Sequence, residues 1–116
     1  MRHRKTVPTL DRKKAVREAL LRNLAQSIVL YEKVQTTRAK AHAVQPLVER
    51  MVTWGKENSL AARRHVGQYM HHQNAVRKVL EVLAPRYKER HGGYTRITRL
   101  GQRQGDGAEM VQIEFV

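Results

Sequence analysis

The spacing of apolar residues changes along this 116-residue chain, from about four positions to two. Apolar side chains recur at helical spacing from Val16 to Ile28, and again from Val76 to Leu83. Over residues 110–116, "MVQIEFV", apolar and polar residues alternate, which is typical of a strand with one buried face. This order predicts helices first and a sheet last, and therefore the α+β fold class.

The sheet is predicted from three segments. Residues 94–100, "YTRITRL", are rich in β-forming side chains, and a loop over residues 101–109 joins them to the last segment. Together they indicate a C-terminal hairpin. Residues 33–37, "KVQTT", favour extended backbone and could add a third strand. We expect several α-helices packed on this small sheet.

Helix boundaries are predicted from capping residues and from proline. Asp11, Ser59 and Asn74 each precede a helical pattern, where a short polar side chain can accept from free backbone amides. Pro46 falls inside a helical pattern and is expected to kink or restart that helix.

Charge is concentrated in two segments. Twenty-three Lys and Arg residues oppose ten Asp and Glu residues, and the formal net charge is +13. Residues 1–22 hold eight bases and two acids, and residues 86–103 hold six bases and one acid. Self-repulsion on this scale destabilises a compact chain unless a polyanion neutralises it. Nucleic acid is the first partner that this pattern indicates, and an anionic membrane surface is the second.

The first charged segment begins with residues 1–10, which lack periodicity and are predicted to form an extended basic arm. A cationic arm that continues into a helix can follow phosphate groups. The alternative is a solvated terminus without a partner. The RNA-binding candidates in this segment are Arg2, His3, Arg4, Lys5, Arg12, Lys13, Lys14, Arg17 and Arg22.

The second charged segment contains the glycine-rich and arginine-rich stretch over residues 92–107. Its glycine pair permits positive φ, its tyrosine could stack on a base, and arginine forks bind phosphate oxygens. The alternative is a hairpin with turn glycines and a charged outer face. The RNA-binding candidates here are Gly92, Gly93, Tyr94, Arg96, Arg99 and Arg103.

The sequence contains no recognisable motif for catalysis, metal binding or nucleotide binding. There is no cysteine, and no carboxylate lies at ligand spacing beside His65, His71 and His72, so no metal site is expected. Neither a phosphate-binding glycine loop nor a dinucleotide fingerprint is present. We therefore expect no enzymatic activity, no cofactor and no small-molecule substrate. Trp54 is expected to pack against its neighbours and not to serve as a stacking platform.

Apolar runs in this sequence are only a few residues long, whereas a membrane span needs about 20. No membrane partner is expected, and the protein is predicted to be soluble and intracellular. The length is most simply that of a single domain over residues 1–116.

Several short motifs follow one another along the chain. They are "MRH" (1–3), "ALLRNLA" (19–25), Thr36-Thr37 with Ala39, Lys40 and Ala41, "AARR" (61–64), "LAPRY" (83–87), "GGYTRI" (92–97) and "GDGAEM" (105–110). In this order they resemble the bacterial large-subunit ribosomal protein number seventeen family, over nearly the whole chain. The chain departs from the family pattern at Val16, His42 and Gln45, among other positions.

The resemblance implies an α+β fold with a small mixed sheet. It also implies a cytoplasmic, structural component of the 50S subunit that binds large-subunit ribosomal RNA near the peptide exit side, beside neighbouring large-subunit ribosomal proteins. By matched position it retains as RNA-binding candidates Arg2, His3, Arg12, Arg17, Arg22, Lys40, Tyr94 and Arg96. The alternative function is that of a basic DNA-binding nucleoid or regulatory protein, although no obvious helix-turn-helix is present.

Overall fold

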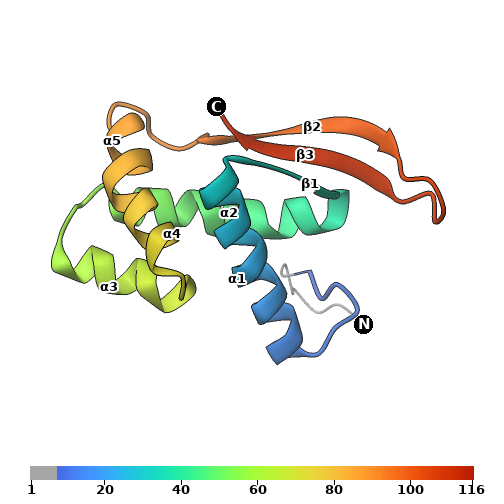
Figure 1. Cartoon of the computed structure of the whole chain (residues 1–116), viewed down its shortest axis with the longest axis horizontal. Coiled ribbons are helices and arrows are strands. Elements are labelled where there is room, and N and C mark those ends of the chain that lie inside the picture. Colours follow the sequence, from blue (N-terminus) through green and yellow to red (C-terminus); the bar gives the residue numbers. More distant parts are fainter. Residues whose placement is uncertain (1–7) are drawn as a thin grey trace.

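The computed structural model describes residues 8–116 (Figure 1). Its elements are α1 (Lys14–Tyr31), β1 (Lys33–Thr37), α2 (Arg38–Gly55), α3 (Leu60–Tyr69), α4 (Gln73–Lys78), the π-helical segment η1 (Val79–Leu83), α5 (Ala84–Arg86), β2 (Thr95–Gln102) and β3 (Glu109–Phe115). The α+β class and the C-terminal hairpin are confirmed. The arm candidates Arg2, His3, Arg4 and Lys5 lie outside the described residues.

The sheet has β3 at its centre, with β1 on one side and β2 on the other. The third strand predicted at Lys33–Thr37 is therefore confirmed. Both outer strands are antiparallel to β3. The expected mixed sheet is corrected: β1 and β2 run in the same direction, but β3 lies between them, so no parallel pair is hydrogen-bonded in the described part of the chain.

Alternation along β3 decides which face of the sheet packs on the helices. Val111 and Ile113 are buried, whereas Gln112 and Glu114 on the opposite face are partly exposed, as the sequence predicts. This face of β3 packs against α2, and the tip of the hairpin extends past the helices (Figure 1).

The connection between the hairpin strands is shorter than predicted. β2 continues to Gln102 and β3 begins at Glu109, so the connection is shorter than the expected loop over residues 101–109. The pairing shifts between Arg99 and Gly101, and Leu100 is the extra residue of this bulge. The ladder therefore extends beyond the stretch with clear β-forming side chains.

The centre of the core is α2, which contacts both α1 and the sheet. One face of this helix is apolar at helical spacing and is fully buried. The buried residues of α2 are Ala41, Val44, Val48, Met51, Val52 and Gly55.

The first half of α1 lies outside this core. Ala25, Ile28 and Val29 are buried, but Val16 is 55% exposed. The predicted stripe is therefore wrong at its N-terminal end. Figure 1 shows that the start of α1 extends past the other described helices.

The helix boundaries agree with the sequence in part. Ser59 caps α3, since its Oγ accepts from the Ala62 N–H at 3.0 Å. The predicted cap at Asp11 is wrong, because this residue has φ of 53° and lies in a turn before α1 begins. Asn74 lies inside α4 and does not cap it. Pro46 does not restart α2, which continues through it.

Glu32 connects three elements at the C-terminal end of α1. Its carboxylate pairs with Lys78 of α4 at 3.2 Å and with Arg86 of α5. Its backbone carbonyl accepts from the Phe115 N–H of β3 at 3.0 Å. The hydrogen bond from Arg86, helped by Lys78, lowers the pKa of Glu32 to about 2 even though burial opposes this shift.

Candidate nucleic-acid interface

The start of α1 presents a group of cations that have no acidic partner within residues 8–116. Arg12, Lys13 and Lys14 are exposed and Arg17 is partly exposed. None of them forms an ion pair within residues 8–116. The first turn of α1 holds no acidic side chain, and Lys13 at the N-cap makes no side-chain capping bond. Free amides at a helix N-terminus favour an anion, and here cations surround them.

The hairpin arginines are arranged differently, because each is paired with a carboxylate. Arg96 donates from Nε and Nη2 to Glu114 Oε1 at 3.3 and 3.0 Å. Arg99 lies 3.5 Å from Glu109, and Arg103 pairs with Asp106. These acids belong to the C-terminal segment, so they offset much of the positive charge that the sequence concentrates before them.

The ion pair at the hairpin tip shifts both of its groups. The hydrogen bond from Arg103, together with the bond from the Ala108 N–H, holds the pKa of Asp106 well below its ordinary value. The same pair raises the pKa of Arg103. All the hairpin arginines remain solvent-accessible, and Arg99 has 76% of its side chain exposed. Exposed pairs of this kind contribute little, so a phosphate can replace the carboxylate at small cost.

Gly92 and Gly93 both have positive φ, 85° and 63°, as the sequence predicts. The expectation for Tyr94 has to be corrected. Its side chain is 1% exposed, with its ring centroid 5.2 Å from that of Tyr87. A ring enclosed in this way has no face to offer a nucleobase, so the predicted stacking role is wrong and the glycine turn instead directs Tyr94 into the core.

The hydroxyl of Tyr94 also has hydrogen-bond partners within the protein. Thr53 Oγ1 and Lys56 Nζ lie 3.4 and 3.3 Å from it. Burial raises the pKa of Tyr94, but hydrogen bonds from Thr53 and Gly92 and the charge of Lys56 outweigh it and lower the pKa. Tyr94 therefore contributes to folding and holds the start of β2 against α2.

The remaining candidates lie on α1 and α2. Arg22 is partly exposed, and its Nη1 lies 3.5 Å from His71 Nε2. Lys40 is partly exposed in the first turn of α2 and makes no ion pair within residues 8–116. The structure thus brings Arg22 beside the α3–α4 connection, which the sequence alone does not indicate.

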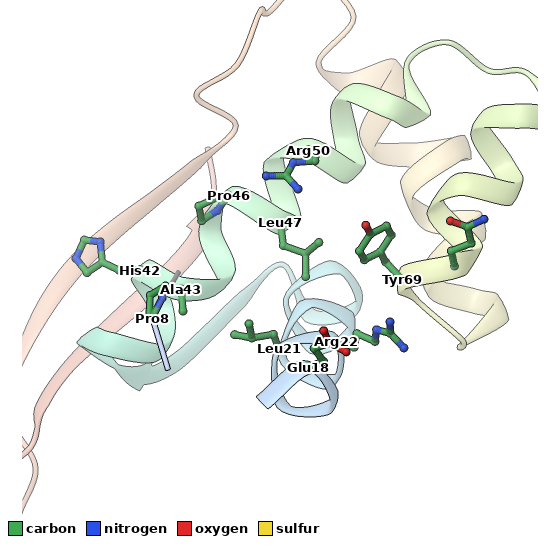
Figure 2. A pocket seen from close by; sticks show the side chains of 11 residues that line it. Pro8, Glu18, Leu21, Arg22, His42, Ala43, Pro46, Leu47, Arg50 and Tyr69 are labelled. Atoms are coloured by element: carbon green, nitrogen blue, oxygen red, sulfur yellow. The ribbon is translucent and has the colours of Figure 1, made fainter. Parts of the chain in front are cut away.

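A groove runs between α1 and α2, and we name it the α1–α2 groove. Its volume is about 690 Å³. Figure 2 shows the side chains that line it, from both helices and from α3. The lining residues are Pro8, Glu18, Leu21, Arg22, His42, Ala43, Pro46, Leu47, Arg50, Gln68 and Tyr69. Sequence reasoning missed Arg50 and Tyr69, because only the packing of the helices brings them together with Arg22.

Within residues 8–116, the histidines and Trp54 form neither a metal site nor a stacking platform for a nucleobase. Trp54 is partly buried against the core, and the His65 ring stacks on it with centroids 3.7 Å apart. The predicted packing role of Trp54 is confirmed. In the part of the chain that the structure describes, no three His, Asp or Glu side chains are grouped as metal ligands, and no helix is long and apolar enough to span a membrane.

Comparison with known proteins identifies the family. The model of the family described as Ribosomal protein L17 matches residues 20–116. A large ribosomal subunit protein bL17 from Thermomicrobium roseum is 48% identical over 116 residues, which cover 100% of this chain and 99% of the relative. The bL17 proteins of an Exiguobacterium strain and of Gemmatimonas aurantiaca are 47% and 45% identical, over 92% and 100% of this chain and 96% and 98% of each relative. The chain belongs to the ribosomal protein L17 family.

Proposed function

We propose that this protein is a structural component of the large ribosomal subunit in the cytoplasm and that it binds large-subunit ribosomal RNA without catalysing a reaction. Membership of the ribosomal protein L17 family and the names of its relatives support the subunit assignment. Residues 1–116 act as a single domain. The protein needs no cofactor, and its partners are the RNA and neighbouring large-subunit proteins.

The observation that carries the RNA-binding part is the difference between the two charged segments. The cations from Arg12 to Arg17 make no ion pair within residues 8–116, whereas the arginines of the hairpin are matched by acids. Unpaired cations repel one another, and a phosphate backbone relieves that repulsion while it releases condensed counterions. The start of α1 is therefore the primary contact, continued by the basic residues of the arm.

The hairpin arginines form the second part of the proposed interface. Arg96, Arg99 and Arg103 exchange their carboxylate partners for phosphates when RNA is present, which costs little at an exposed surface. Gly92 and Gly93 allow the backbone to approach the RNA closely. The position near the peptide exit side rests on the family resemblance alone.

Salt dependence tests the proposal. The affinity of the full chain for large-subunit ribosomal RNA is measured by filter binding between 50 and 200 mM salt. If six to ten phosphates are engaged, affinity falls by roughly a thousandfold or more. A nearly flat salt dependence, or equal affinity for a duplex DNA competitor, contradicts the proposal and favours the alternative of a basic DNA-binding protein.

A matched pair of variants locates the contact. Lys14→Gln removes an exposed cation at the start of α1 and should reduce the slope of log affinity against log salt by about one. Arg77→Gln removes an exposed cation of α4 that pairs with Glu81 at 3.8 Å. It should leave the slope unchanged. Equal effects of the two variants would mean that binding depends on total charge and not on this surface.

A further inference from the structure

The α1–α2 groove combines an apolar floor with cations at its edges. Leu21 from α1 and Leu47 from α2 point into the space between the two helices (Figure 2). Arg22 and Arg50 extend from the same two helices, so one cation stands on each side. Glu18 is the single acid among the lining residues. The groove therefore suits a ligand that is both partly apolar and anionic.

Tyr69 closes the groove at the α3 end. Its ring lies against Trp54, with centroids 5.4 Å apart, and this contact fixes it in place. Figure 2 shows its hydroxyl pointing away from α3 toward α2. This hydroxyl makes no hydrogen bond with another side chain or backbone atom of residues 8–116. A fixed aromatic ring with a spare polar group is a suitable contact for a nucleobase.

Arg50 is the second group in the groove with unused binding capacity. It is exposed, and within the described residues its guanidinium forms neither an ion pair nor a side-chain hydrogen bond. Arg22 has one 3.5 Å contact, to His71, and no carboxylate partner in the same part of the chain. Two arginine forks without carboxylates on opposite sides of an apolar floor match the phosphates that flank a base.

We propose that the α1–α2 groove binds one unstacked nucleotide of RNA. Its base lies against Leu47 and Tyr69, and Arg22 and Arg50 contact the adjoining phosphates. A volume of about 690 Å³ is within the range of small-ligand pockets, roughly 300–1,000 Å³. Proteins recognise single-stranded RNA in this way, by enclosing a base that has left the helical stack. The inference rests on the proposed RNA binding and adds a specific site to it.

Charge favours a nucleotide over a peptide from a neighbouring protein. A peptide strand or helix in the groove would leave the two arginines buried without an anion, which is costly unless the peptide carried matching acids. Every nucleotide of RNA brings that anion with it. The groove also continues the surface at the start of α1, because Lys14, Glu18 and Arg22 follow one another at intervals of four and share a face of α1.

The test uses the full chain bound to large-subunit ribosomal RNA transcribed with 4-thiouridine. After irradiation and digestion, we expect a nucleotide adduct on the peptide that contains Tyr69. Ala43→Phe fills the groove without changing charge, and should remove this adduct and weaken binding by about five- to a hundredfold, the usual effect of losing one stacked base. Ala61→Phe adds the same ring to an exposed position of α3 outside the groove, and should change neither.

A thermal melt shows whether Ala43→Phe is folded. If it is not, the charge variant Arg50→Gln tests the site instead. Arg50→Gln should reduce the salt slope by about one, and Arg77→Gln should not. Suppose that the wild type shows the expected salt dependence, but that no adduct forms in the groove and Arg50→Gln has no effect. This result would overturn the nucleotide site and leave RNA binding intact. Absence of any RNA binding would instead contradict the proposed function. A crosslink from the groove to another protein in assembled subunits would also overturn the site.

Discussion

Glu32 is the residue whose replacement most directly tests how α1 is fixed to the rest of the fold. Its pKa is lowered from 4.5 to about 2, chiefly by the hydrogen bond from Arg86, with Lys78 as the second partner. At 1.36 kcal/mol per unit, the full shift corresponds to about 3 kcal/mol. Because 38% of the side chain is exposed, solvent screening reduces the expected contribution to about 1 kcal/mol.

The sign of the pH dependence follows from the direction of the shift. A carboxyl group with a lowered pKa stabilises the fold fully above its ordinary value of 4.5, and this contribution is lost as the pH falls toward 2. Glu32→Gln should therefore reduce the free energy of unfolding by about 1 kcal/mol at pH 7 and by almost nothing near pH 2. Denaturant titrations of both proteins across this range measure the difference.

Glu57→Gln is the matched control, since Glu57 is exposed and forms no ion pair within residues 8–116. This variant should be as stable as the wild type at every pH. If Glu32→Gln lost the same stability at pH 2 as at pH 7, the loss would come from packing and not from the ion pairs. If it lost none at pH 7, the two partners would contribute nothing and the reasoning would be refuted.

Three further predictions concern packing and the hairpin. Ile113→Ala, at a fully buried position of the central strand, should lower the free energy of unfolding by about 2–5 kcal/mol in denaturant titrations; a loss below 1 kcal/mol would contradict the assigned core. Tyr87→Phe removes a 2.7 Å hydrogen bond to the Val116 carbonyl and should lower the free energy of unfolding by about 1 kcal/mol in the same assay. Unchanged stability would mean that this hydrogen bond does not stabilise the fold. Asp106→Asn removes the carboxylate that a phosphate has to displace from Arg103, and should strengthen RNA binding in the filter assay by roughly two- to fivefold, whereas unchanged affinity would mean that the hairpin tip does not reach the RNA.

The sequence predicted the hairpin and third strand because their signals are local. Alternation of Val111 and Ile113 with polar neighbours is enough to identify a half-buried strand. The burial of α1 was predicted less well, since apolar spacing shows which residues share a face but not how far a partner helix extends along it. Val16 continues the spacing and yet is exposed.

Site residues were harder to predict because their environment depends on residues distant in sequence. The pairing of Arg99 with Glu109 depends on the hairpin register, and that register contains a bulge beside Gly101, which the sequence analysis assigns to the loop. Tyr94 follows a glycine pair, which allows the chain to turn but does not determine whether the ring turns inward or outward. Arg50 and Tyr69 become neighbours only through the packing of α2 and α3.

We propose that the cations at the start of α1, which form no ion pair within residues 8–116, contact ribosomal RNA. Crosslinking in living cells, followed by mapping of RNA-modified peptides from purified large subunits, tests it directly. We predict RNA adducts on peptides within residues 12–22, recovered in amounts that exceed those from another exposed segment, residues 57–61. Large subunits that contain the protein but carry no RNA adduct on those peptides would contradict the account.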